Sequence, residues 1–237
     1  MRELLLAGRR RVHEVLLAAD LDPAPVLDDI RELAAEGRVP VREVARGRLE
    51  AQARTDAPQG VLAHAAELPE TDLDDLARPG PGGVPPFLVA LVGVTDPGNL
   101  GALLRSAEGA GATGIVLPKH RSVHVTPAAT KAAAGAIEHL PIALVGGLPA
   151  ALARLRELGV WVVGLDGSAD RPLWSVELGT DPVALVLGAE GSGLGRLVRS
   201  RCDVVVAIPL AGRLGSLNVA AAGALACFEV ARRRAPG

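Results

Sequence analysis

Short, uninterrupted apolar runs recur along the chain from residue 87 onward, and helical patterns separate them. The run Phe87–Val94 (FLVALVGV) has no polar alternation, which is typical of a strand buried on both faces, as in a parallel sheet. Strands that alternate with helices through short connections predict an α/β domain with a mostly parallel sheet. Further strands are expected at 114–117, 142–145, 160–165, 183–187 and 204–210, and helices at 100–109, 127–135, 149–158, 196–200 and 217–230.

The last of these helices is unusual, because residues 217–230 are almost all small and apolar and include many alanines. Alanine is the best helix former, and a helix without a polar face is expected to be buried. Ser216 and Asn218 lie at its start, and the Ser216 hydroxyl is a candidate N-cap.

The first 65 residues follow a separate pattern of shorter elements. The segment Ala77–Pro86 (ARPGPGGVPP) then interrupts the chain, because its four prolines and three glycines can neither continue a helix nor donate the hydrogen bonds of a sheet. We therefore expect a small α/β domain over 1–68, a Pro/Gly-rich linker over 69–86 and a second domain over 87–237. In the first domain, helices are expected at 1–6, 26–36 and 44–53, and strands at 12–17, 39–41 and 61–65.

Composition limits the choice of partners and compartments. The chain has 237 residues, of which 49% are hydrophobic, and a net charge of −2, so a nucleic acid would have to be bound through a local basic patch. Cys202 and Cys227 lie in apolar surroundings without metal-ligand spacing, so no disulfide and a reducing cytoplasm are expected. No apolar stretch is long and charge-free enough to span a bilayer, so no membrane partner is expected.

Three loops that follow strands carry polar residues, at the edge where open α/β sheets bind ligands. The first, 95–105, contains Asn99, a possible N-cap, and Arg105, an unexpected cation in an apolar helix that could simply reach solvent. The second, 187–195, holds glycines at 188, 191, 193 and 195 around Glu190, a carboxylate at the end of a buried strand. The third is Arg213–Asn218.

Other chemistries fit these loops less well. The glycine run of the second loop does not match the dinucleotide-binding GxGxxG spacing, and Glu190 would repel a pyrophosphate. His120 and His124 are four residues apart, but the valines beside them favour a strand or loop over a metal-binding helix. No metal site is therefore expected.

Taken in order, the three loops resemble the SpoU (TrmH-like) family of RNA 2′-O-ribose methyltransferases, which belong to the SPOUT superfamily. The similar segments are DPGNLGALLRSAEGAG (96–111), ALVLGAEGSGL (184–194) and IPLAGRLGSLNVAAAGAL (208–225), with TKAAAGAIEHLPI (130–142) between the first two. The N-terminal module resembles the ribosomal-protein-like substrate-binding domain of this family. The resemblance covers nearly the whole chain.

The resemblance implies a trefoil-knotted SPOUT (α/β knot) fold, a homodimer and S-adenosylmethionine (AdoMet) as cofactor. It also assigns two sets of site residues. Those expected to line the AdoMet site are Leu187, Gly188, Ile208 and Leu217. Those expected at the polar catalytic positions are Asn99, Arg105, Glu190, Ser216 and Asn218.

The implied reaction is methyl transfer to a ribose 2′-hydroxyl, which must lose its proton. Arginine stays protonated in proteins, so we expect Arg105 to stabilise the developing alkoxide or hold a phosphate rather than act as the base. Asn99 and Asn218 would orient groups, and Glu190 would hold Arg105 or a loop amide. Many relatives have an acidic residue where this chain has Val92. The sequence departs from the family pattern at this position, and a contact made by that carboxylate would be missing here.

The expected substrate is ribosomal RNA of the 23S type, because of the N-terminal module. Transfer RNA is the alternative, and a catalytically silent RNA-binding assembly factor is another. A housekeeping role and a role in antibiotic resistance both fit the sequence.

Overall fold

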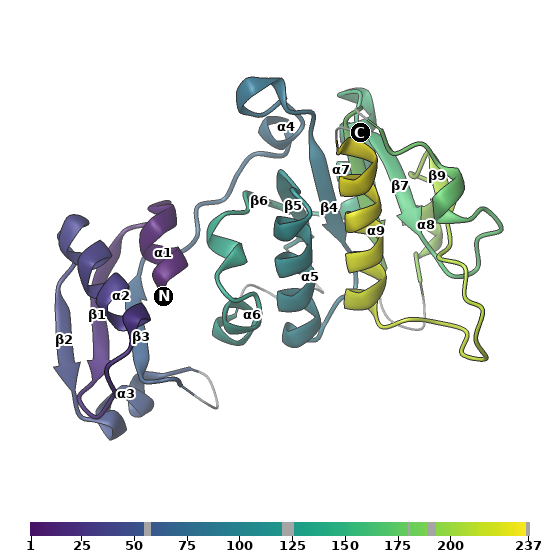
Figure 1. Ribbon diagram of the computed structural model, residues 1–237. Helices are drawn as coiled ribbons and strands as arrows, with labels where there is room; N and C mark the ends of the chain where they lie inside the picture. Colours follow the sequence, from purple (N-terminus) through teal and green to yellow (C-terminus); the bar gives the residue numbers. More distant parts are fainter. Residues whose placement is uncertain (55–57, 120–125, 180, 189–192, 236–237) are drawn as a thin grey trace. The chain divides into compact units, whose positions relative to one another are not determined.

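The computed structural model describes residues 1–54, 58–119, 126–179, 181–188 and 193–235 (Figure 1). It divides into two compact units, Met1–Pro69 and Glu70–Gly237. Each unit is described here by itself.

The first unit is built around β1 (Val12–Ala18), the central strand of a sheet with the order β2-β1-β3. It pairs in parallel with β2 (Val41–Val44) and antiparallel with β3 (Val61–Ala65). Three helices accompany the sheet: α1 (Arg2–Ala7), α2 (Pro25–Glu36) and α3 (Arg46–Gln52). The second strand begins two residues later than expected, because the Val39 N–H donates to the Ala34 carbonyl of α2 and Pro40 has no N–H to donate.

The second half of β1 is covered on both faces, which explains the apolar run at residues 15–18. Successive residues of a strand point to opposite faces. Val15 and Leu17 are buried on one face with Leu27 of α2, and Leu16 is buried on the other with Leu49 of α3.

The second unit contains a six-stranded sheet with the order β6-β5-β4-β8-β7-β9. All neighbouring strands are parallel, which confirms the expected α/β class with a mostly parallel sheet. The strands are β4 (Phe87–Leu91), β5 (Gly114–Pro118), β6 (Ile142–Val145), β7 (Trp161–Leu165), β8 (Val183–Leu187) and β9 (Val204–Val206). The helices are α4 (Leu73–Leu76), α5 (Pro97–Gly109), α6 (Pro127–Ala132), α7 (Leu148–Glu157), α8 (Arg196–Arg199) and α9 (Val219–Arg234).

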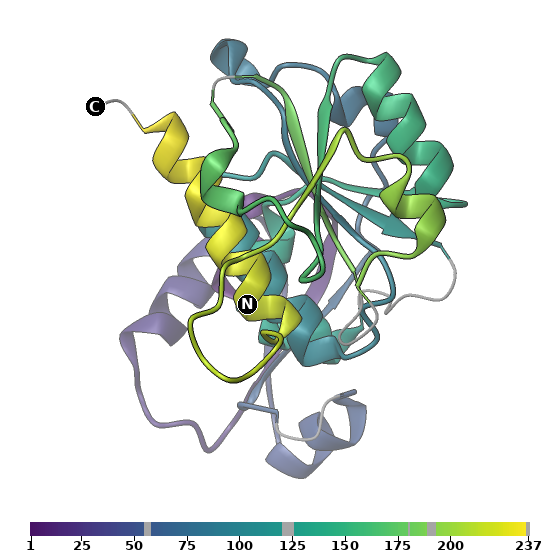
Figure 2. The ribbon, with the colours of Figure 1, turned by 90° about the vertical axis from the view of Figure 1, so that its right-hand side faces the viewer.

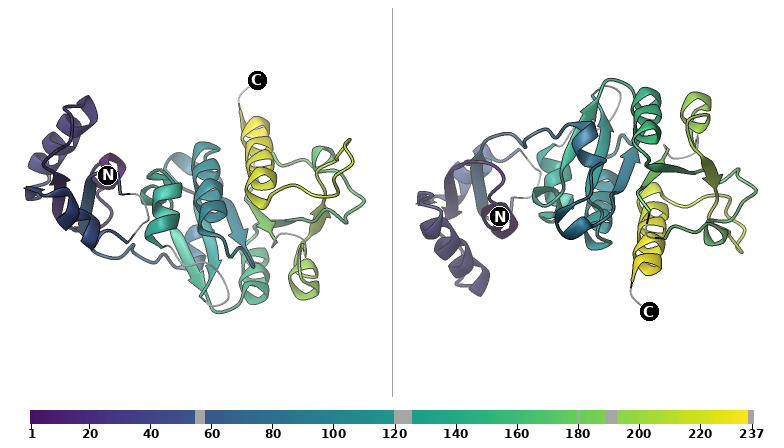
Figure 3. Two further views of the ribbon diagram at one scale, coloured as in Figure 1. Left: turned by 90° about the horizontal axis from the view of Figure 1, so that it is seen from below. Right: turned by 90° about the horizontal axis from the view of Figure 1, so that it is seen from above.

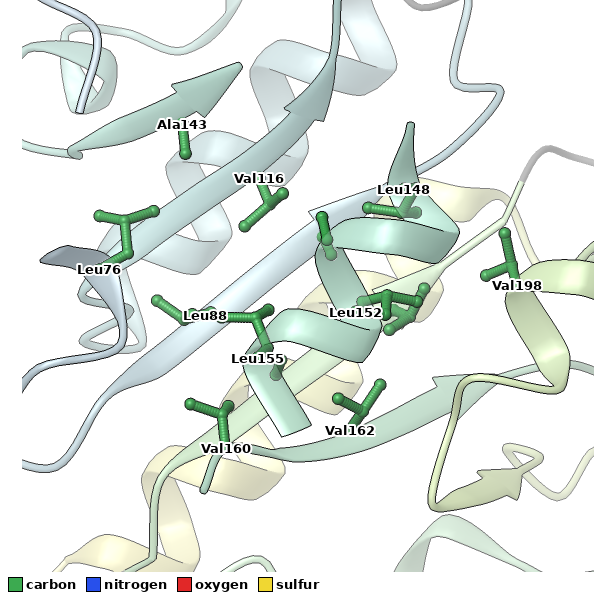
Figure 4. Close-up of a cluster of buried hydrophobic side chains, with 14 of the residues drawn as sticks. Leu76, Leu88, Val116, Ala143, Leu148, Leu152, Leu155, Val160, Val162 and Val198 are labelled. Atoms are coloured by element: carbon green, nitrogen blue, oxygen red, sulfur yellow. The ribbon is translucent and has the colours of Figure 1, made fainter. Parts of the chain in front are cut away.

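Helices cover both faces of this sheet. Figure 2 shows α5 and α9 on one face and α7 and α8 on the other, and the views of Figure 3 agree. On the α7 face, Leu148, Leu152 and Leu155 pack onto strand residues such as Val116 and Val162 (Figure 4). Each fully buried leucine of this kind contributes about 2 kcal/mol, so the core fixes the strand ends firmly.

The segment 70–86, expected as part of the linker, groups with the second unit. Glu70 forms a parallel bridge with Ile142 at the start of β6. Leu76 of α4 is buried in the α7 core, and Arg154 of α7 forms a 2.6 Å ion pair with Asp74.

The expectation that the last helix is buried all round is wrong for the chain on its own. One face of α9 packs against α5, so that a Cβ built on Gly223 would collide with Leu103. Leu225 and Phe228 are 46% and 52% exposed. The single chain supplies α5 and the sheet as neighbours, and they cover only one side of α9. The trefoil knot that the resemblance implies stays a prediction.

Candidate active site

Four neighbouring strands, β4, β8, β7 and β9, end at one level, and the three predicted loops follow three of them. Leu187, the last residue of β8, is in register with Leu91 of β4 and Leu165 of β7. Leu165 is in turn opposite Val206, the last residue of β9. Because the strands are parallel, the loops after β4, β7, β8 and β9 lie at one edge of the sheet, which we call the carboxyl edge.

Asn99 and Asn218, from the first and third predicted loops, are in direct contact. The Asn218 Nδ2 donates a 2.9 Å hydrogen bond to Asn99 Oδ1. The Asn218 Oδ1 accepts from the backbone amides of Ala220 and Ala221, and so caps α9. Since only the oxygen can accept from those amides, the orientation of the Asn218 side chain is fixed.

Both candidate caps differ from the expectation. Ser216 is exposed and lies before the cap, which is Asn218. The cap of α5 is Asp96, whose Oδ1 accepts a 2.7 Å hydrogen bond from the Asn99 amide. Pro97 takes the first position of the helix, where its missing N–H costs nothing, so the preceding residue becomes the cap. The Asn99 side chain is thereby used for the tertiary contact.

The structure describes Arg105 but not Glu190, so it does not test their expected contact. Arg105 lies on the exposed side of α5, and no hydrogen bond or ion pair connects its guanidinium to the residues that the structure describes. Glu190 lies outside the described residues, so its expected contact with Arg105 or a loop amide is untested. The exposure of Arg105 suits either a side chain that meets substrate or one that only reaches solvent.

The described ends of the glycine loop approach each other closely. The Gly193 carbonyl oxygen lies where a Cβ of residue 188 would be, so only glycine fits at position 188. Gly193 itself has a φ of +58°, which favours glycine. Leu187 is buried just before this point. The backbone at the two described ends of the glycine loop is therefore packed together, and we call this close contact between Gly188 and Gly193 the cradle.

The other two expected AdoMet residues lie in or beside the third loop. Ile208 is half-buried, two residues after the end of β9, and Leu217 is exposed in the loop, two residues before α9. The strand was expected to continue to residue 210, but it ends at Val206, and Ala207 then bridges to Pro172. The loop from 209 to 218 is exposed throughout.

A fourth loop, after β7, was missed by the sequence reasoning. Asp166 follows the strand, and its carboxylate accepts hydrogen bonds from the amides of Ser168 (2.9 Å) and Leu194 (3.0 Å). It also accepts from the Ser168 hydroxyl (2.7 Å) and pairs with Arg199 (3.2 Å). The available signal was an acidic residue directly after an apolar strand (VWVVGLD), as with Glu190.

The pKa of Asp166 reflects this environment. Burial opposes ionisation and by itself raises the pKa of the Asp166 carboxyl. The hydrogen bonds from Ser168 and Leu194 and the charge of Arg199 together outweigh burial, so the pKa lies below its usual range. Asp166 is therefore a carboxylate at neutral pH.

Val92, the departure from the family pattern, is used for packing. Its side chain is partly buried against the α7 core, and its N–H donates a 3.0 Å hydrogen bond to the Leu187 carbonyl. An apolar side chain therefore fits this position, which closes the end of β4 onto β8.

The described residues offer neither a metal centre nor a reactive thiol. Within them, no group of three His, Cys, Asp or Glu side chains could hold a metal ion, and His120 and His124 lie outside them. Burial raises the pKa of the Cys202 thiol to about 11 and that of Cys227 to about 12, so both stay protonated at neutral pH. None of the helices in the described part of the chain is long and apolar enough to cross a membrane.

Two family models match the chain, one for each unit. The SpoU rRNA Methylase family matches residues 86–228, and the model described as RNA 2′-O ribose methyltransferase substrate binding matches residues 2–71.

Relatives and solved structures agree with these matches. YacO of Bacillus subtilis, whose TrmH-family name leaves tRNA and rRNA open as substrates, is 42% identical over 98% of this chain and 92% of its own. The 23S rRNA (guanosine-2′-O-)-methyltransferase RlmB of Pseudomonas putida is 38% identical over 99% of this chain and 94% of its own. The SpoU methyltransferase AviRb of Streptomyces viridochromogenes, solved in complex with AdoMet, superposes with a TM-score of 0.78. It is 27% identical and covers 97% of this chain and 85% of its own. The expected SpoU methyltransferase fold is confirmed, and the chain belongs to the SpoU rRNA Methylase family.

Proposed function

We propose that this protein transfers a methyl group from AdoMet to the ribose 2′-hydroxyl of a guanosine in ribosomal RNA of the 23S type. The observation that carries the proposal is the hydrogen bond between Asn99 and Asn218, which joins the first and third family motifs at the carboxyl edge. The choice of RNA is supported by the similarity to RlmB over nearly the full length of both chains.

AdoMet would be held by Leu187, Gly188, Ile208 and Leu217. The close approach of Gly193 to Gly188 supports this, because it brings the backbone of both ends of the glycine loop together beside the buried side chain of Leu187. When bound, AdoMet supplies an electrophilic methyl group on a sulfonium. The protein then needs only to orient the ribose and ease the loss of its proton.

The polar residues would divide this work. Arg105 would stabilise the negative charge that develops on the 2′-oxygen, or hold a neighbouring phosphate, because a guanidinium matches the geometry of a phosphate and donates to an anionic oxygen. Asn99 and Asn218 would orient ribose groups, and Ser216 would assist from the third loop. Glu190 would hold Arg105 or a loop amide in place.

The first unit would bind the RNA, as its match to the substrate-binding family suggests. Not every arginine in it is equally suited to meet phosphate. Arg46 is already engaged by Asp20 at 2.7 Å, whereas Arg11 and Arg48 are exposed and make no side-chain ion pair with the described residues. These two are the better candidates.

We also propose that two copies associate through α9. Its exposed face carries Leu225 and Phe228, large apolar side chains that a second copy would remove from water. We propose a cytoplasmic location, because the proposed substrate is ribosomal RNA. The trefoil knot of the family belongs to the same proposal.

Methyl transfer to defined RNAs tests the function. The protein is incubated with methyl-labelled AdoMet and separately with protein-free 23S rRNA, assembled large subunits and bulk tRNA. Label in 23S rRNA or subunits, at a ribose 2′-oxygen, is the expected result. Label in tRNA alone would replace the substrate, and AdoMet binding without transfer to any RNA would favour the silent assembly factor.

A further inference from the structure

Asp166 links three separate parts of the chain at the carboxyl edge. It follows β7, and its side chain is only 10% exposed. One oxygen, Oδ1, accepts from the amide and hydroxyl of Ser168 in its own loop. The other, Oδ2, accepts from the Leu194 amide and pairs with Arg199 of α8. Both oxygens are thus occupied, and each faces a different segment.

The same carboxylate lies against the glycine that closes the proposed AdoMet cradle. A Cβ built on Gly193 would be 2.7 Å from Asp166 Oδ2, and the Gly193 carbonyl oxygen lies where a Cβ of Gly188 would be. A continuous series of contacts therefore runs from Asp166 through Gly193 to Gly188. The third loop is also near, because a Cβ built on Gly167 would be 3.8 Å from the Gly215 carbonyl oxygen.

We infer that Asp166 is a positioning residue for AdoMet binding, which holds Gly193 and Leu194 against Gly188 and so keeps the cradle formed. This inference rests on the proposed function. Asp166 is not expected to touch the reacting atoms, so its loss weakens binding of AdoMet and leaves the chemical step intact once AdoMet is saturating.

Asp203 provides a matched control at the opposite edge of the same sheet. Its carboxylate accepts from one backbone amide, that of Val162 at 2.8 Å, and pairs, like that of Asp166, with one arginine, Arg156 at 2.7 Å. It precedes β9, and its carboxylate makes no hydrogen bond or ion pair with those residues of the glycine loop that the structure describes. Replacing either aspartate by asparagine therefore weakens an ion pair with an arginine, and only the change at 166 also affects the contacts to Ser168 and Leu194.

The experiment measures the Kd of AdoMet by calorimetry for wild type, Asp166→Asn and Asp203→Asn. An asparagine at 166 can accept on one side only, so either Ser168 or Leu194 loses its partner. We expect the Kd to rise about tenfold for Asp166→Asn, the equivalent of one charge-assisted hydrogen bond, and less than twofold for Asp203→Asn. In steady-state assays, KM for AdoMet rises by the same factor, while KM for RNA and kcat change little. A purely structural role would instead lower both variants' Tm and alter AdoMet binding equally.

Each outcome has a distinct meaning. Wild type that binds AdoMet, with Asp166→Asn binding as tightly as Asp203→Asn, overturns this inference and leaves the proposed function standing. Wild type that does not bind AdoMet overturns the proposed function itself. If Asp166→Asn does not fold, Ser168→Ala takes its place, because Ser168 is exposed and its hydroxyl is one of the carboxylate's partners. It should raise the Kd about threefold, and an unchanged Kd would overturn the inference.

Discussion

The Asn218 side chain donates a 2.9 Å hydrogen bond to Asn99 Oδ1 across 119 residues of sequence. Each asparagine lies at the start of a helix, and these helices, α5 and α9, pack together on one face of the sheet (Figure 1). The oxygen of the same side-chain amide, Asn218 Oδ1, caps α9. One side chain therefore sets both where α9 begins and where it lies relative to the first motif.

Substitution of Asn218 separates these two roles. Aspartate is an equally good N-cap, but it cannot donate a hydrogen bond and would place a negative charge against Asn99 Oδ1. We expect Asn218→Asp to keep the free energy of unfolding within about 1 kcal/mol of wild type and to lose most methyl transfer. Asn218→Ala should lose the cap as well, at a cost of about 1 kcal/mol. Chemical denaturation and a methyl-transfer assay measure the two effects, and an active Asn218→Asp would show that the contact is dispensable.

Gly188 and Gly195 bracket the glycine loop and make a matched pair. A Cβ at 188 would collide with the Gly193 carbonyl oxygen, whereas one at 195 would meet nothing within 4 Å. We expect Gly188→Ala to weaken AdoMet binding at least about tenfold, because overpacking against backbone costs about 1–3 kcal/mol. Gly195→Ala should bind normally in the same calorimetric measurement. Equal binding by the two variants would mean that the cradle is not the AdoMet site.

The sequence predicted the parts of the site that depend on local pattern. Buried apolar runs predict where the strands end, and the segments that follow them carry the polar residues of the site, such as Asn99. Asp166 was missed because two of its partners, Leu194 and Arg199, are distant in sequence and share no spacing with it. The N-cap of α5 was predicted at the wrong residue, because Asp96 and Asn99 are both good caps and only the position of Pro97 decides between them. The exposed face of α9 could not be foreseen, because apolar composition indicates burial without naming the partner.

Glu229 near the end of α9 should make stability depend on pH. Hydrogen bonds from Arg232 lower the pKa of the Glu229 carboxyl, and those from Arg233 add to this against the opposing effect of burial, to give a value of about 2. A folded-state pKa below the unfolded value of about 4.5 means that the stabilisation is present above pH 4.5 and is lost as pH falls toward 2. Glu229→Gln should therefore cost about 2 kcal/mol at pH 7. Urea denaturation of both proteins between pH 7 and pH 2.5 should show this difference shrinking, and a constant difference would contradict the assignment.

Phe228 tests the proposed association of two copies. The Phe228 side chain is 52% exposed on α9. Phe228→Glu therefore changes the fold of the single chain little, but it places a charge where a second copy would pack. We expect light scattering to give twice the chain mass for wild type and the single-chain mass for the variant. Glu108→Ala, an exposed change on α5, is the control and should keep the wild-type mass. A monomeric wild type would refute the dimer.

The most direct test of the proposed function is nucleoside mass spectrometry of 23S rRNA after incubation with AdoMet and either wild type or Arg105→Ala. Arg105 is exposed and makes no contact in the described fold that its loss would break, so the variant should keep its Tm. We predict one new 2′-O-methylguanosine with wild type and a rate lower by about 10²–10³-fold with Arg105→Ala. A folded Arg105→Ala that methylates at the wild-type rate, or methylation by wild type on a base instead of a ribose, would contradict the proposal.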